Sequence, residues 1–155
     1  MSASASITLR RATRADALTL ADIHIAARAT AMPWLRVVHT TEETRWWMTQ
    51  VVVPRLEVWV AERDGATLGF AALQDEWLEH LYVEPSAWHA GAGTLLLNHA
   101  KQRQPAGLKL WTFQRNALAR AFYAKHGFSE MRETDGSANE EREPDVMLAW
   151  KPSTH

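Results

Sequence analysis

The segment 77–113 restricts the fold more than any other part of the sequence. WLEHLYV at 77–83 and KLWTF at 109–113 have the aromatic and branched composition of strands, and between them apolar residues recur at helical spacing from Ala92 until Pro105. A strand, helix and strand in succession place the two strands parallel in one sheet, joined by a right-handed crossover. We therefore expect an α/β (α+β) protein whose sheet contains at least one parallel pair.

Before this segment, the sequence predicts a strand and two helices. A strand at 7–13 leads into a first helix that ends near Pro33. The second helix begins at Thr40, which forms a capping pair with Glu43. We expect this helix to stop at Pro54, because the residue before a proline avoids helical backbone angles.

A hairpin and three later elements complete the pattern. The hairpin covers 56–73 and turns at Asp64-Gly65, since this dipeptide readily adopts the left-handed angles of a tight turn. A further helix is capped by Asn116, and two short strands follow around 129–134 and 145–150. The expected fold is a central, twisted, mixed sheet of about six or seven strands, flanked by about four helices.

Composition excludes several classes of function. The chain has 155 residues, a formal net charge of −1 and no cysteine, so disulfides and thiolate chemistry are excluded and a nucleic-acid-binding stripe is not expected. No metal site and no membrane segment are expected either, and the default location is the cytoplasm. We expect one domain at 7–151, a disordered segment at 1–6, and a monomer or homodimer.

The stretch YVEPSAWHAGAGTLL, residues 82–96, joins a strand to a helix through a loop with two glycines. Such a loop can hold phosphate, because backbone N–H groups and the helix dipole both point at the anion. It is neither a dinucleotide fingerprint, since Leu96 replaces the third glycine, nor a Walker A loop, since Thr94-Leu95 follow the last glycine. A tightly packed strand-to-helix turn without a ligand is the alternative.

A second motif identifies the phosphate. Asn116, Ala119, Phe122, Tyr123, Gly127 and Phe128 fit the pattern N-x-x-A-x-x-F-Y-x-x-x-G-F. Together with Val83, Pro85, Gly91 and Gly93, they make this chain resemble the GCN5-related N-acetyltransferase (GNAT) superfamily, over about a third of its length. In that family the loop has the form Q/R-x-x-G-x-G/A and holds the pyrophosphate of coenzyme A.

The resemblance implies a coenzyme site at the loop and at the edge of a strand that splays from its parallel neighbour. The residues it implies are Leu81, Tyr82, Val83, Trp88, His89, Ala90, Gly91, Ala92, Gly93, Thr94, Asn116 and Phe122. Trp88 departs from the family, which has Gln or Arg there. Losing that contact weakens binding by about 1.5 to 3 kcal/mol. Trp88 either stacks on the adenine or packs on the surface.

Two residues are candidates for catalysis. The resemblance implies that Tyr123 is the general acid that protonates the leaving thiolate, the alternative being a core tyrosine bonded to a carbonyl. Glu79 is the candidate base, since a carboxylate in an apolar strand needs a partner or a wet cleft. It is expected on the face of Leu81 and Val83, and a Glu–Arg ion pair is its alternative. A backbone N–H near Val83 would polarise the thioester.

The resemblance implies an acceptor site at the first helices and the loop between the last strands. Trp34, Trp46, Glu79, Asn139 and Glu140 are its candidate residues. An acidic loop beside aromatic side chains would suit a small cationic amine. The alternative is that this loop is only a solvated, charged turn. We expect transfer of an acetyl group from acetyl-CoA to a primary amine of a small molecule. The alternatives are an enzyme acting on protein amino termini or lysines, and a non-catalytic acyl-CoA-binding or partner-binding module.

Overall fold

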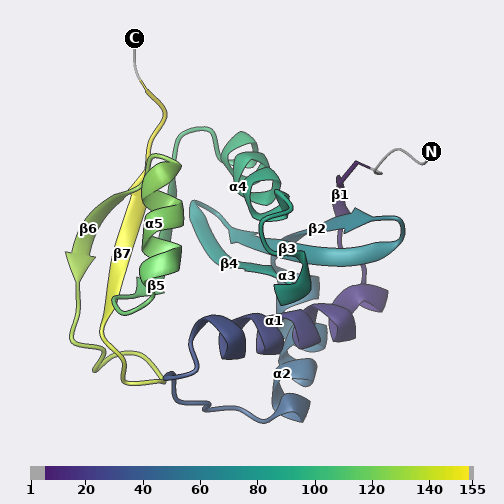
Figure 1. Ribbon diagram of the computed structural model, residues 1–155, viewed down its shortest axis with the longest axis horizontal. Helices are drawn as coiled ribbons and strands as arrows, with labels where there is room; N and C mark the ends of the chain where they lie inside the picture. The colour runs from purple at the N-terminus through teal and green to yellow at the C-terminus, as the bar shows by residue number, and fades with distance from the viewer. Residues whose placement is uncertain (1–5, 154–155) are drawn as a thin grey trace.

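The computed structural model describes residues 6–153, which form one seven-stranded mixed sheet with helices on both faces (Figure 1). The strands lie in the order β1-β2-β3-β4-β5-β7-β6. This confirms the predicted single α/β domain, including the parallel pairing of β4 with β5. Of the segment 1–6, for which the sequence predicts disorder, residues 1–5 lie outside the described part of the chain.

The elements follow the expected order along the chain. The strands are β1 (Thr8–Arg11), β2 (Glu57–Arg63), β3 (Ala66–Gln74), β4 (Trp77–Val83), β5 (Leu108–Phe113), β6 (Ser129–Glu133) and β7 (Asp145–Trp150). The α-helices are α1 (Ala17–Ala31), α2 (Thr41–Trp47), α3 (Val53–Arg55), α4 (Ala92–Arg103) and α5 (Ala117–Lys125). Asp64 and Gly65 have φ angles of 53° and 77°, as the predicted hairpin turn between β2 and β3 requires.

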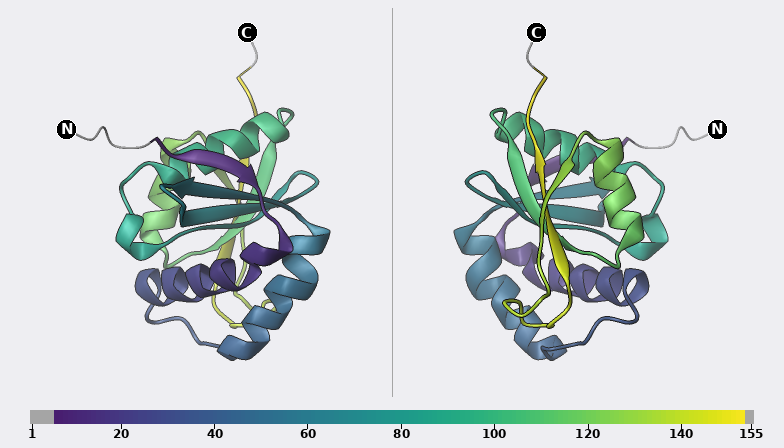
Figure 2. Two further views of the ribbon diagram at one scale, coloured as in Figure 1. Left: turned by 90° about the vertical axis from the view of Figure 1, so that its right-hand side faces the viewer. Right: turned by 90° about the vertical axis from the view of Figure 1, so that its left-hand side faces the viewer.

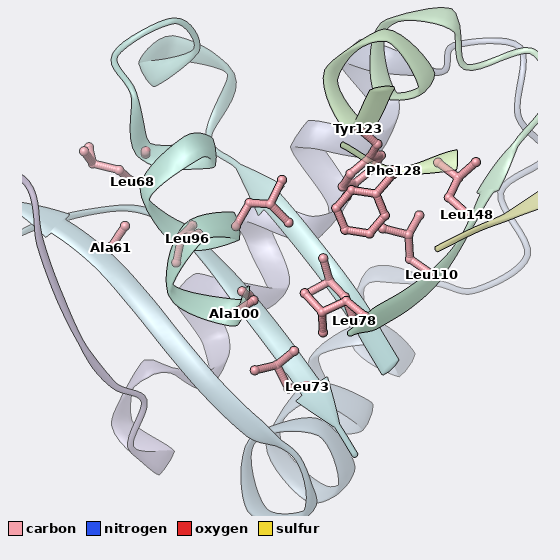
Figure 3. Packing of buried hydrophobic residues seen from close by; sticks show 14 of the residues in the cluster. Ala61, Leu68, Leu73, Leu78, Leu96, Ala100, Leu110, Tyr123, Phe128 and Leu148 are labelled. Atoms are coloured by element: carbon pink, nitrogen blue, oxygen red, sulfur yellow. The ribbon is translucent and has the colours of Figure 1, made fainter. Parts of the chain in front are cut away.

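Each face of the sheet has its own hydrophobic core, so β3 is buried on both sides. Phe70 and Ala72 pack under α1 and α2, whereas Ala71 and Leu73 pack under α4. Figure 2 shows the two helix layers on opposite sides of the sheet, and Figure 3 shows the core beneath α4 and α5. Burial of each large apolar side chain there contributes about 1.5 to 3 kcal/mol.

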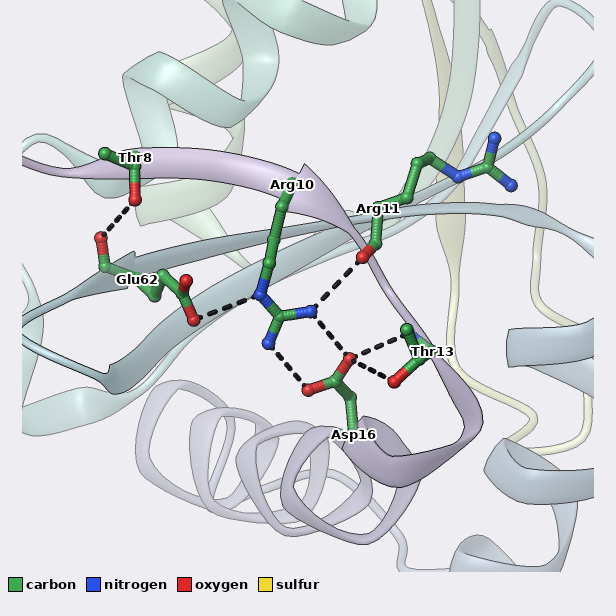
Figure 4. A network of polar contacts seen from close by, with 6 residues as sticks. All are labelled: Thr8, Arg10, Arg11, Thr13, Asp16 and Glu62. Carbon is green, nitrogen blue, oxygen red and sulfur yellow. Dashed lines mark hydrogen bonds and ion pairs between the residues drawn. The ribbon is translucent and has the colours of Figure 1, made fainter.

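An ion-pair network attaches the start of α1 to the edge of the sheet. The Arg10 guanidinium donates to both carboxylate oxygens of Asp16 at 2.8 Å and pairs with Glu62 at 3.1 Å (Figure 4). Asp16 also accepts the backbone N–H of Thr13 at 2.7 Å. The bond from Arg10 is the largest factor that lowers the pKa of Asp16 to about 2. Thr13 and Asp16 form a capping box at the start of the helix, and this box is therefore part of a larger network.

The second helix continues past Pro54, where the sequence predicted a stop. α2 runs through a π-helical turn at Met48–Val52 into α3, and the N–H of Val53 donates to the carbonyl of Met48. The wider turn shifts the hydrogen-bond register just before the proline. Pro54 then occupies the first turn of α3, where a missing N–H costs nothing. The prediction was wrong because it used only the backbone angles that the residue before a proline prefers. These angles give no information on a change of hydrogen-bond register within the helix.

β4 and β5 separate after a single paired position. Trp77 pairs with Lys109, whose N–H donates to the carbonyl of Glu76 at 2.8 Å. No further β4–β5 pair occurs among the described residues, whereas β5 stays paired with β7 from Leu108 to Phe113. The edge of β4 that faces β5 is therefore free of ladder bonds over most of its length, as the predicted splay requires.

A β-bulge interrupts the side-chain alternation of β4. Ala72 pairs with His80 and Leu73 with Leu78, so Glu79 has no partner on β3. Leu78 consequently takes the core position that regular alternation assigned to Glu79, beside Leu81. The expectation that Glu79 shares a face with Leu81 and Val83 was wrong, because a one-residue bulge turns its exposed side chain away from the packed face.

Candidate active site

A cleft of about 490 Å³ opens where β4 and β5 separate. Its walls include Glu79, His80, Tyr82, Phe113, Asn116 and Tyr123. These residues come from the two splayed strands and from the start and middle of α5, which follows β5 directly. The splay thus brings the two candidate catalytic residues, Tyr123 and Glu79, to one cavity although they are far apart in the sequence.

Tyr123 lies on the inner side of α5 and is only 8% exposed. Its ring packs edge-on against Phe122 at a centroid distance of 5.3 Å. It also packs edge-on against Phe128, at 5.4 Å (Figure 3). Within the described residues its hydroxyl has no hydrogen-bond partner, yet it is not among the fully enclosed unpaired atoms, so it reaches the cleft. Burial raises the pKa of Tyr123, which therefore keeps its proton.

Glu79 projects from the bulge into the same cleft. No ion pair to Glu79 occurs among the residues that the structure describes, so the sequence alternative of a Glu–Arg pair is not found there. Partial burial raises the pKa of its carboxyl, although the residue stays exposed to solvent. An unpaired carboxylate of raised pKa beside a cleft has the properties of a general base.

The glycine loop leaves the first turn of α4 open to a ligand. Gly91 is the residue before the helix and has a φ of 95°, which favours glycine, while His89 has a φ of 69°. The N–H groups of its first turn, including those of Ala92, Gly93 and Thr94, have no intrahelical acceptor, and no side chain of the described residues caps them. A Cβ at Gly91 would meet no atom within 4 Å, so the surface above the loop is open.

Trp88 folds back onto the end of β4. Its indole Nε1–H donates to the carbonyl of Val83 at 2.8 Å, and the ring is partly buried. Of the two sequence alternatives, packing is the one that this contact favours. The bond also occupies a carbonyl at the end of the free edge of β4.

A groove of about 800 Å³ lies on the other side of the sheet edge, between α1, α2 and the loop that joins them. Ile25, Met32 and Leu35 provide apolar surface, and Trp46 stands at its margin with 62% of its area exposed. Glu140 and Glu141 close one end of the groove. The groove and the cleft share Arg28, Met32 and His80, so they meet at these residues.

The acidic loop between β6 and β7 is occupied by its own ion pairs. Glu140 contacts His39 at 2.6 Å, Glu141 contacts Arg28 at 3.0 Å and Glu143 contacts Arg115 at 3.1 Å. The pairs with His39 and Arg28 attach the loop to the α1–α2 region. Arg28 and Arg115 offset the charge of Glu141 and Glu143, so the charge complementarity inferred from the sequence is weakened.

Of the remaining predicted site residues, some line the cleft and others do not. Asn116 lines the cleft and also caps α5, accepting the N–H of Ala119 at 3.1 Å. Phe122 packs towards Gly93, where an added Cβ would lie 3.6 Å from its ring. Asn139 lines the cleft, but its amide donates to the carbonyl of Glu143 at 2.8 Å. Trp34 lines neither cavity and instead lies under the Arg115 guanidinium, 4.1 Å from its ring centroid.

A cluster at the junction of the two cavities was missed by the sequence analysis. Arg28 donates to the hydroxyl of Tyr82 at 3.0 Å, and His24 packs edge-on against Tyr82 and His80 at 4.7 and 5.8 Å. One signal was available: Leu20, His24 and Arg28 are spaced by four along α1 and share the face that carries the buried Leu20. Polar residues on such a face mark a cavity or a buried network.

Residues 54–130 match the family model for the acetyltransferase (GNAT) domain. This range contains β4, the glycine loop, α4, β5 and Tyr123, and so most of the cleft described above. About half of this chain, residues 54–130, therefore belongs to the GCN5-related N-acetyltransferase superfamily. Within the described residues of this GNAT domain, no helix is long and apolar enough to cross a membrane, and no group of three potential metal ligands is present.

Relatives of this GNAT domain agree with the observed fold. The peptidyl-lysine N-acetyltransferase YjaB of Salmonella typhimurium is 34% identical over 77 residues, which cover 49% of this chain and 52% of that protein. The match thus spans about half the length of the curated relative. Apo YjaB from Escherichia coli superposes with a TM-score of 0.80 at 22% identity, covering 96% of this chain and 99% of that one.

A further solved structure was determined with a ligand. The PaiA N-acetyltransferase of Thermoplasma acidophilum, in complex with coenzyme A, has a TM-score of 0.74 at 21% identity, covering 95% of this chain and 99% of that one. At such identities the two structural likenesses establish the GNAT fold.

Proposed function

We propose that this protein is an acetyl-CoA-dependent N-acetyltransferase that acts on a primary amine. The observation that carries the proposal is the cleft in which the unpaired β4 edge meets the Tyr123 side chain. The uncapped N-terminus of α4 follows β4 in the chain and supports it. Membership of the GNAT superfamily supports it, as does the coenzyme A bound by the structurally similar PaiA.

The coenzyme would lie across the loop and along β4. Its pyrophosphate would accept hydrogen bonds from N–H groups between His89 and Thr94, favoured by the dipole of α4. Its pantetheine amides would pair with the free edge of β4 at Leu81 and Val83, as an added strand would. This path leads from the glycine loop towards the cleft that Tyr123 lines.

The reaction requires three proton movements. An ammonium acceptor loses one proton to become a nucleophile, the nitrogen loses a second after attack on the thioester, and the leaving thiolate gains one. We assign the proton on sulfur to Tyr123, which burial keeps protonated. Glu79, unpaired at the bulge, accepts the proton released at the reacting centre. A backbone N–H near Val83 polarises the thioester carbonyl.

The acceptor is the least constrained part of the proposal, and we assign it to a small-molecule amine. The groove that meets the cleft at Arg28 and His80 has apolar side chains, and the paired Glu140 and Glu141 close one end of it. An amine with an apolar or aromatic body fits this lining better than a compact polycation. Trp46, at the margin of the groove, would contact such a body.

A protein amine is the second candidate. The 34%-identical YjaB of Salmonella typhimurium is a peptidyl-lysine N-acetyltransferase. In this chain, Val37 and Trp46 are 86% and 62% exposed at the margin of the groove, as a surface that receives a protein segment would be.

Calorimetric titration with acetyl-CoA tests the first step. A dissociation constant in the micromolar range, about −8 kcal/mol, supports the proposal. A thiol-release assay with 2-phenylethylamine, spermidine, an alanine-initiated peptide and an amino-blocked lysine peptide then separates the acceptor classes. The absence of binding at millimolar acetyl-CoA contradicts the proposal and favours the non-catalytic alternative.

A further inference from the structure

The junction between groove and cleft is formed by three side chains, of which one can accept a proton. Arg28, Met32 and His80 line both cavities. A guanidinium stays protonated under all ordinary conditions, and a thioether is only a weak acceptor. An amine that passes from the groove to the thioester must therefore pass the imidazole of His80.

His80 is held in place by packing and has no polar partner. Trp47 lies edge-on to its ring at a centroid distance of 5.0 Å, and His24 at 5.8 Å. Among the residues that the structure describes, neither ring nitrogen of His80 is hydrogen-bonded, and neither is among the fully enclosed unpaired atoms. The nitrogens are thus accessible from the cavities, in a ring whose orientation its neighbours fix.

The surroundings keep this imidazole neutral. Burial, followed by the positive charge of Arg28, lowers the pKa of His80 to about 4. The same factors, with His80 itself, lower the pKa of His24 to about 3. Glu141 pairs with Arg28, and Tyr82 accepts a hydrogen bond from it. At neutral pH the ring therefore presents an unshared electron pair to an incoming group.

We propose that His80 accepts the first proton of the acceptor, as its ammonium group moves from the groove into the cleft. The N–H bond of the ammonium breaks, its electron pair stays on nitrogen, and the proton goes to the ring and then to water in the groove. The apolar groove assists, because desolvation also lowers the pKa of the ammonium. Glu79 is left with the second proton, released after attack. This inference rests on the proposed function.

Chemical rescue tests the assignment. The variant His80→Ala is assayed for thiol release with acetyl-CoA and the acceptor of the panel that the wild type uses fastest. We expect turnover to fall about ten- to a hundredfold with an unchanged Michaelis constant for acetyl-CoA. Added imidazole should restore it increasingly between about pH 6 and 8, where the free base forms. Pyrrole has a similar shape but no basic nitrogen and should restore nothing.

Two further variants serve as controls. His80→Gln keeps a polar side chain of similar size without a basic ring, so it should be as slow as His80→Ala. It replaces His80→Ala in the test if the alanine variant folds poorly. His99→Gln removes an imidazole that lines neither cavity, and should change turnover less than about threefold. Wild-type turnover in His80→Gln, or equal rescue by pyrrole and imidazole, overturns the assignment of His80.

The wild type distinguishes this inference from the function on which it rests. If wild-type protein fails to bind acetyl-CoA or acetylates no member of the panel, the proposed function fails and the role of His80 fails with it. If the wild type is active and the variants show no base-specific loss, only the role of His80 is overturned.

Discussion

The indole Nε1–H of Trp88 donates a 2.8 Å hydrogen bond to the backbone carbonyl of Val83. The contact joins the loop before α4 to the end of the free β4 edge. It occurs at the position where other GNAT sequences have Gln or Arg. The proposed coenzyme site therefore has one less charge-assisted donor and one edge carbonyl already occupied.

Replacing Trp88 should therefore strengthen coenzyme binding. Trp88→Arg supplies a charged donor and releases the Val83 carbonyl. We expect acetyl-CoA to bind about ten- to a hundredfold more tightly, the equivalent of about 1.5 to 3 kcal/mol. Calorimetric titration measures the change. Trp88→Phe, which releases the carbonyl without adding charge, is the matched control, and an unchanged affinity in Trp88→Arg would contradict the assigned position of the loop.

Removal of the Tyr123 hydroxyl should impair turnover without impairing binding. In Tyr123→Phe the packing against Phe122 and Phe128 is kept. Within the described chain the hydroxyl has no hydrogen-bond partner, so its removal leaves no other group unpaired. We expect kcat to fall about a hundredfold or more, with little change in the dissociation constant of acetyl-CoA. A thiol-release assay measures kcat, and calorimetric titration measures the dissociation constant. A variant with wild-type kcat would remove Tyr123 from the mechanism.

The elements that carry this site could be predicted because their signals are local. The strand, glycine loop, helix and strand of 77–113 appear in the sequence as a change of period, two glycines and a proline. The bulge at Glu79 could not be predicted in the same way, since it depends on the register between β4 and β3. The pairing of Arg28 with Tyr82 and Glu141 joins three distant segments, and no local pattern encodes it.

The two glycines of the loop should respond differently to alanine. Gly91 has a φ of 95°, so Gly91→Ala should lower the free energy of unfolding by about 1 kcal/mol and weaken acetyl-CoA binding. Gly93 lies within α4, where an added Cβ makes only ordinary contacts at 3.6 and 3.7 Å. Gly93→Ala should therefore leave stability almost unchanged and weaken binding only if phosphate lies against it. Urea unfolding and calorimetry on both variants separate backbone strain from ligand proximity. Equal stability losses in the two variants would contradict this distinction.

The Arg10–Asp16 pair should give a pH-dependent contribution to stability. Its carboxylate has a pKa of about 2, lowered from 3.8, so the folded state holds the ionised form more strongly than the unfolded chain does. The stabilisation is complete above the unfolded pKa of about 3.9 and is lost as pH falls through that value towards 2. Because Arg10 is 39% exposed, solvent screening limits the effect to about 1 to 2 kcal/mol.

Urea unfolding of wild type and Asp16→Asn measures this contribution. The variant should be less stable by about 1 to 2 kcal/mol at pH 7 and at pH 5, and the difference should shrink between about pH 4 and pH 2, since the wild type loses its ionised partner there. Asp22→Asn is the matched control: Asp22 also pairs with an arginine, Arg45, but its side chain is 52% exposed and, within residues 6–153, it belongs to no wider network. Its loss should cost about 0.5 kcal/mol or less. A difference for Asp16→Asn that persists undiminished at pH 3 would show that packing at the start of α1, and not ionisation, is what the carboxyl contributes.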